Sequence, residues 1–137
     1  MKLGVPMEPE GETRVGITPM SLKKLHKAGF EVIIESGAGK AANYHDADYQ
    51  EAGATVGTRE EVLACENIVC IRFPGTEGIS EGANIACVAD PFRNPHYVKA
   101  CMTSGITLLS MDMIPRRLSR AQSMDVNSSQ DNLAGYK

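Results

Sequence analysis

Polar side chains that could bind a ligand are concentrated in the segment 115–137, PRRLSRAQSMDVNSSQDNLAGYK. Its arginines and carboxylates can form charge-assisted pairs, and its amides can donate and accept hydrogen bonds at once. Few apolar positions could anchor this segment to a core, so it does not resemble a packing segment. Because chain ends are commonly disordered, the residues taken alone favour a polar cap with a fraying end.

The cysteines and histidines do not have the spacing of a metal site. Cys65, Cys70, Cys87 and Cys101 form no C-x-x-C pair and have no flanking His at zinc-finger spacing. Cys70 and Cys87 lie within apolar runs typical of buried strands, where a free thiol behaves as a small hydrophobe. The histidines fall in unrelated contexts, at His26, His45 and His96. We therefore predict buried, reduced thiols and no metal.

Gly37, Gly39 and Ala42 spell G-x-G-x-x-A directly after a predicted strand. In nucleotide-binding folds this pattern lets the backbone approach a pyrophosphate at a helix N-terminus. Here the motif follows the second strand, the residues after it make a poor first helical turn, and no strand ending in Asp or Glu follows about 20 residues on. We interpret the motif as a glycine turn at the strand end.

The elements that must position these residues alternate between strands and helices. Short apolar runs predict strands at 2–6, 31–35, 67–72, 84–89 and 106–109. Capping residues predict helices from Thr18 to Gly29, at 46–52 and 58–64, and from Asn94 to Gly105. The helix at 58–64 begins with a capping box, and the last helix has Val98 and Met102 on one face.

This alternation predicts an α/β fold. Runs that are apolar on both faces indicate a mostly parallel sheet with helices on both faces, a three-layer domain of Rossmann-like or flavodoxin-like type. A length of 137 residues fits one domain. The net charge of −3 excludes a basic field that would attract nucleic acid. No secretory h-region or membrane span is present, so we expect a soluble, cytoplasmic segment without direct membrane insertion.

Two stretches resemble one enzyme family. Residues 2–54 resemble the start of the alanine dehydrogenase and pyridine nucleotide transhydrogenase family. In the tail, R-A-Q-S-M-D followed by S-S-Q and A-G-Y resembles the alpha-subunit branch of the transhydrogenases. The resemblance implies that residues 1–137 are a partial N-terminal domain. Residues 115–137 would be its cofactor-contacting loop and the start of an inter-domain helix. The family's second, NAD-binding Rossmann domain would follow, and the chain would later return to complete the first domain.

The resemblance assigns the tail a role in binding NAD(H), in place of a fraying end. Arg117, Gln122, Asp125, Ser128 and Ser129 would line the NAD(H) site, and Arg117, Gln122 and Asp125 would serve the reaction itself. A Gln side chain can meet the acceptor and donors of a nicotinamide carboxamide, and an Arg with a nearby Asp can fix the loop.

The departures from the family favour the transhydrogenase branch. Arg14 in ETRVGITP matches the arginine that holds the substrate carboxylate in the dehydrogenase branch. That branch also places a Lys after the fourth strand and a His after the fifth, where this chain has Arg72 and no His; His96 on the following helix is not an equivalent. Deamination of alanine needs a general acid/base, whereas hydride transfer between two nicotinamides needs none.

The function implied by this resemblance is that of the NAD(H)-binding alpha subunit of a proton-translocating transhydrogenase. Hydride would pass from NADH to NADP+, with NADP(H) held by a partner subunit. The segment would work with the remaining domains and subunits, as a homodimer, at the cytoplasmic face of a membrane complex. The isolated chain is expected to be inactive, because the second domain would supply most of the NAD(H) contacts. The alternatives are a catalytically silent binding or assembly module and, less favoured, a fragment of an alanine dehydrogenase-type enzyme.

Overall fold

The structure, a computed structural model, describes residues 1–115, 117 and 119–135. Within these ranges six strands form one parallel sheet in the order β3-β2-β1-β4-β5-β6. The strands are β1 (Lys2–Val5), β2 (Glu31–Glu35), β3 (Thr55–Gly57), β4 (Asn67–Val69), β5 (Asn84–Cys87) and β6 (Thr107–Ser110). The predicted α/β class is confirmed.

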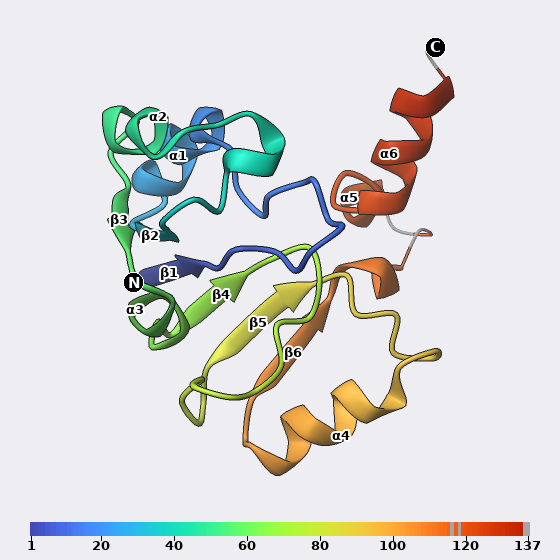
Figure 1. Cartoon of the computed structure of the whole chain (residues 1–137). Coiled ribbons are helices and arrows are strands. Elements are labelled where there is room, and N and C mark those ends of the chain that lie inside the picture. Colours follow the sequence, from blue (N-terminus) through green and yellow to red (C-terminus); the bar gives the residue numbers. More distant parts are fainter. Residues whose placement is uncertain (116, 118, 136–137) are drawn as a thin grey trace.

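Helices cover both faces of the sheet (Figure 1). The helices α1 (Pro19–Lys27) and α2 (Asp46–Glu51) lie on one side, and α3 (Arg59–Leu63) and α4 (Pro95–Thr103) on the other. Short 3-10 helices η1 (Lys40–Ala42) and η2 (Met111–Met113) follow β2 and β6. The last two helices, α5 (Ser119–Gln122) and α6 (Val126–Gly135), lie beyond the carboxyl ends of the strands. No helix in the described ranges is long and apolar enough to cross a lipid bilayer.

Side-chain alternation along the strands separates two hydrophobic cores. Leu3 and Val5 of β1 face α1 and α2, where the buried side chains of Leu22 and Tyr49 meet them. The second core joins β4, β5 and α4, and its members are Leu63, Ile68, Cys70, Ile85, Cys87, Ala89, Cys101 and Ile106. On the α3 side of β1 stands Gly4, where a Cβ atom would lie 2.2 Å from the Val62 carbonyl oxygen. The absent side chain at Gly4 therefore lets α3 pack directly on the β1 backbone.

The capping signals place the helices correctly. Thr58 and Glu61 form the predicted capping box: the Glu61 N–H donates to Thr58 Oγ1 at 3.3 Å, and the Thr58 N–H donates to Glu61 Oε2 at 2.8 Å. Pro19 is the first residue of α1, and that helix ends just before Gly29. Local hydrogen bonding and backbone geometry therefore determine where these two helices begin and end.

Two expectations about the elements need correction. The sequence patterns miss β3, a three-residue edge strand too short to show periodicity, and they extend β4 and β5 two to three residues too far. Val98 and Met102 share a face of α4, as predicted, and this is the outer face, where their exposed fractions are 36% and 77%. The inner face of α4, which contacts β6, buries the smaller Cys101.

Candidate functional site

The chain reverses its direction of winding between β1 and β4. From β1 it moves outward through β2 and β3, and it then returns to β4 and continues through β5 and β6. In open parallel sheets, ligands bind outside the carboxyl ends of the strands at such a switch point, because the loops leaving the two strands separate there. The loops that follow β1 and β4 are therefore where a site is expected.

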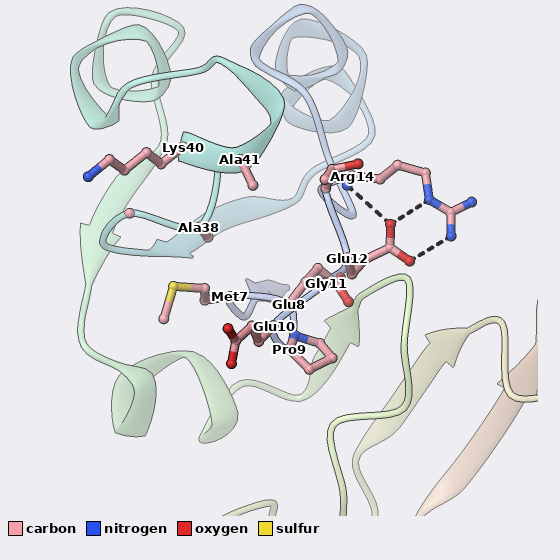
Figure 2. Close-up of a pocket in the computed structure, with 12 residues that line it drawn as sticks. Met7, Glu8, Pro9, Glu10, Gly11, Glu12, Arg14, Ala38, Lys40 and Ala41 are labelled. Carbon is pink, nitrogen blue, oxygen red and sulfur yellow. Dashed lines mark hydrogen bonds and ion pairs between the residues drawn. The ribbon is translucent and has the colours of Figure 1, made fainter.

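A pocket of about 410 Å³ opens beside this point, between the loop that follows β1 and the turn that follows β2. The loop from Met7 to Arg14 forms one wall, and the turn from Gly37 to Ala41 forms the other (Figure 2). Gly37 has a φ of 81°, and a 3-10 turn follows it, as expected of a glycine turn. A second hollow of about 540 Å³ lies on the other side of the same loop, against Arg72, Phe73 and Tyr97.

One carboxylate joins the two arginines singled out in the sequence. Arg14 donates from Nε to Glu12 Oε1 and from Nη2 to Glu12 Oε2, both at 2.7 Å (Figure 2). Arg72 donates from Nε to Glu12 Oε2 at 3.0 Å. The hydrogen bonds from Arg14 lower the pKa of Glu12 from its ordinary 4.5 to about 2. Glu12 is not among the residues that the sequence patterns singled out, although it lies only two positions before Arg14.

Two further carboxylates fix the loop that follows β1. Glu8 accepts the backbone N–H groups of Ile71 at 2.6 Å and Arg72 at 2.9 Å, which ties the loop to the residues after β4. Desolvation raises the pKa of Glu8 in spite of these hydrogen bonds. Glu35 accepts the N–H of Met7 at 2.8 Å and pairs with Arg59 at 3.1 Å. The loop is therefore held from both neighbouring strands.

Acid titration should reveal the contribution of Glu12. Its pKa is lower in the folded chain than the ordinary 4.5, so its contribution to stability is complete above pH 4.5 and is lost as the pH falls toward 2. We expect Glu12→Gln to lower the free energy of unfolding at pH 7 by about 1 kcal/mol. The variant should also lose less stability on acidification than the parent, measured by urea unfolding from pH 7 to pH 3.

Glu8→Gln is the matched control for this titration. Glu8 has the opposite effect on the pH dependence of stability, because its raised pKa favours the folded state at low pH. Removing Glu8 should therefore steepen the loss of stability on acidification, whereas removing Glu12 should flatten it. Identical pH profiles for the two variants would contradict the assigned roles.

The tail residues Asp125, Ser128 and Ser129 meet in the first turn of α6. Asp125 is 2% exposed; its Oδ1 accepts the N–H of Asn127 at 3.1 Å, and its Oδ2 accepts the Ser128 hydroxyl at 2.5 Å. Its carbonyl oxygen accepts the Ser129 N–H at 3.2 Å and the Ser129 hydroxyl at 3.1 Å. Asp125 thus caps α6, as short acidic residues commonly do at helix N-termini.

The other tail residues are only partly placed. Arg117 is exposed in a turn before α5, and Gln122 is the last residue of that helix. Tyr136, in the A-G-Y motif, lies outside the described residues. Residues of the segments 7–14 and 37–41 line the 410 Å³ pocket, and no tail residue with a described position does. The tail residues therefore form a separate group from Glu12 and its two arginine partners, Arg14 and Arg72. The two groups share the carboxyl-end side of the sheet (Figure 1).

The four cysteines are free and buried, as predicted. Burial raises the pKa of Cys65 and Cys101, and a hydrogen bond with Cys87 does the same for Cys70, so these thiols stay protonated. Among the residues with described positions, no group of three or more His, Cys, Asp or Glu side chains is placed to hold a metal ion.

Comparison with known proteins gives this arrangement a family. Residues 4–134 match the family described as alanine dehydrogenase/PNT, N-terminal domain. The chain belongs to this family. An NAD(P) transhydrogenase alpha-subunit chain of Rhodospirillum rubrum is 43% identical to it, over 100% of this chain and 38% of the relative. The predicted family membership is therefore confirmed.

Solved structures of both branches share the family fold. A transhydrogenase from Sinorhizobium meliloti superposes with a TM-score of 0.91 at 38% identity, covering 99% of this chain and 40% of that one. An L-alanine dehydrogenase gives a TM-score of 0.80 at 27% identity, covering 88% of this chain and 34% of the other. The chain spans less than half the length of each of these proteins.

Proposed function

We propose that this segment is the portion of an NAD(P) transhydrogenase alpha subunit that meets the nicotinamide end of NAD(H). The observation that carries the proposal is the match to the Rhodospirillum rubrum alpha-subunit chain over the whole of this sequence. In this proposal residues 1–137 form part of the N-terminal domain. Residues 115–137 form the cofactor-contacting loop and the start of an inter-domain helix.

The tail residues suit a nicotinamide carboxamide, which has one acceptor and two donors. The Asp125–Ser128 cap gives the loop a fixed turn at the carboxyl-end side of the sheet. Arg117 is exposed and able to donate, and Gln122 carries a side-chain amide that can donate and accept. The bound NADH would supply the hydride. The chain's own role is to orient the ring and to exclude water from its reacting face.

The same proposal assigns roles to the other domains and subunits of the complex. A second domain holds most of NAD(H), and a partner subunit holds NADP(H), so that hydride passes from NADH to NADP+. Proton translocation belongs to the membrane-embedded regions of the complex. The segment pairs as a homodimer with its second copy, on the cytoplasmic face of the membrane, and is inactive when isolated.

The pairing of Arg14 weighs against turnover of an amino acid. A substrate carboxylate would need donors on the Arg14 guanidinium, and Glu12 takes two of its five N–H groups, on Nε and Nη2, which leaves the Nη1 edge. This pairing gives Arg14 a structural role in the loop after β1. Together with the match to transhydrogenase alpha subunits over the whole chain, this pairing supports the transhydrogenase branch.

One observation favours an assembly module as the second candidate. On the sheet face opposite α4, a shallow apolar hollow of about 170 Å³ includes Leu3, Ala86 and Leu109, and Leu109 is 51% exposed. The apolar lining of this hollow, with the exposed Leu109 at its edge, could receive an apolar side chain of another protein segment. A module of this class would bind a partner through the hollow without contributing to hydride transfer.

A chimera distinguishes the candidates. Residues 1–137 replace the equivalent segment of the Rhodospirillum rubrum alpha-subunit chain, and the other transhydrogenase subunits are added. We expect hydride transfer from NADH to an NADP+ analogue, and no NADH production from L-alanine and NAD+. Assembly without hydride transfer would support the silent module, and sustained oxidation of L-alanine would revive the dehydrogenase.

A further inference from the structure

Asp112 connects the ends of two neighbouring strands. It lies in η2, directly after β6, and its Oδ1 accepts the Ser110 hydroxyl at 2.6 Å. Its Oδ2 accepts the backbone N–H of Asp90 at 3.1 Å, and Asp90 follows β5. The two oxygens of one carboxylate thus receive donors from two separate strand exits, an arrangement that an apolar side chain cannot reproduce.

The backbone at Asp90 needs this support. Asp90 has a φ of 43°, in the left-handed region that residues other than glycine rarely adopt. Its carbonyl oxygen accepts the N–H groups of Arg93 and Asn94, and the Asn94 side chain donates to it at 3.2 Å. A backbone conformation of this kind persists only where its surroundings hold it, and Asp112 holds its N–H.

The turn that contains Asp112 also supports the tail. Met111–Met113 forms η2, and α6 packs against that turn. The first turn of α6 carries Ser128 and Ser129 and is capped by Asp125. The position of this cap relative to the sheet therefore depends on the conformation of η2, which the carboxylate of Asp112 fixes.

We propose that Asp112 is a positioning residue for hydride transfer: it fixes the turn on which α6 rests and so places the tail residues against the nicotinamide. The proposal rests on the proposed function of the tail. Asp112 itself touches no reacting atom. Its removal should alter the alignment of the two nicotinamide rings more than it alters the affinity for NADH.

The chimera described above allows a direct test by rapid-mixing kinetics. Asp112→Ala should slow hydride transfer by about tenfold to a hundredfold, because a misplacement of about 1 Å has effects of that size. The dissociation constant for NADH should stay close to that of the parent. Glu51→Ala, which removes an exposed carboxylate from the end of α2, is the matched control and should leave the rate unchanged.

Conservative substitution separates positioning from charge. In Asp112→Asn the amide oxygen can still accept the Asp90 N–H, and the NH2 group can donate to the Ser110 hydroxyl oxygen. We expect this variant to recover most of the rate. Adding Ser110→Ala removes the new acceptor and should abolish the recovery. Equal rates for Asp112→Ala and the parent, or equally slow Ala and Asn variants, would overturn the proposal.

Amide hydrogen exchange tests the positioning independently of activity. In Asp112→Ala the N–H groups of Asp90 and of the first turn of α6 should exchange faster than in the parent chimera, while those of β1 should not change. Unchanged exchange at both places would overturn the role of Asp112, whatever the activity. If the parent chimera shows no hydride transfer, but amide exchange is still faster in Asp112→Ala, the result counts against the proposed function and leaves the positioning role of Asp112 intact.

Discussion

Replacing Gly4 by alanine is expected to lower the free energy of unfolding by about 3 kcal/mol, at the upper end of the usual cost of overpacking. The added Cβ atom would lie 2.2 Å from the carbonyl oxygen of Val62 and 3.1 Å from its carbonyl carbon. Both are backbone atoms of α3, so no side-chain rotation can relieve the contact. β1 is the strand at which the chain reverses its winding, and it pairs with β2 and β4. A shift of α3 would therefore disturb the centre of the sheet.

Urea unfolding of the Gly4→Ala chain measures this effect. Gly135→Ala is the control, because a Cβ atom at that position has open space around it. Alanine is also the better helix former, so this control should be neutral or slightly stabilising. Similar unfolding midpoints for the two variants would show that α3 does not pack as closely on β1 as the structure indicates.

Replacing Gln122 by alanine in the chimera is expected to slow hydride transfer about tenfold to a hundredfold, because the variant would lose the proposed hydrogen bond to the carboxamide, which would let the ring leave its reacting position. The affinity for NADH should fall much less, since the second domain is proposed to supply most of the contacts. Arg117→Ala should act in the same direction. Single-turnover kinetics give the transfer rate, and fluorescence titration gives the dissociation constant for NADH.

Gln130→Ala is the matched control for this prediction. Gln130 lies on the exposed surface of α6, eight positions further along the same tail. The Gln130→Ala variant loses the same kind of amide group, but no contact of Gln130 with the cofactor is proposed. Its rate of hydride transfer should therefore equal that of the parent chimera. Unchanged turnover in Gln122→Ala would remove Gln122 from the proposed site.

Local signals predicted most of the fold. The reciprocal bonds of Thr58 and Glu61, and Pro19 at the start of α1, act within one helical turn and can be read from a few residues. The packing face of α4 could not be predicted in this way. Val98 and Met102 are the more hydrophobic pair by sequence, but Cys101 is the residue of α4 that lies buried in the core with β5.

The site was less accessible to sequence reasoning than the fold. Glu8 and Ile71 are 63 positions apart, and Glu12 and Arg72 are 60 apart, so only the pairing of β1 with β4 brings them together. The cap formed by Asp125 and Ser128 has the local spacing of a helix start, and the tail motif did single out both residues. The link from Asp112 to Asp90 again depends on the neighbouring positions of β5 and β6.

A crystal structure of the chimera with NADH bound tests the role of the tail most directly. If the tail forms the nicotinamide site, the carboxamide of the ring will lie within hydrogen-bond distance, about 3 Å, of the Gln122 side chain. The ring will also lie on the carboxyl-end side of the sheet, beside the turn capped by Asp125. A nicotinamide ring bound away from residues 117–129, with its carboxamide held by other groups, would contradict this assignment.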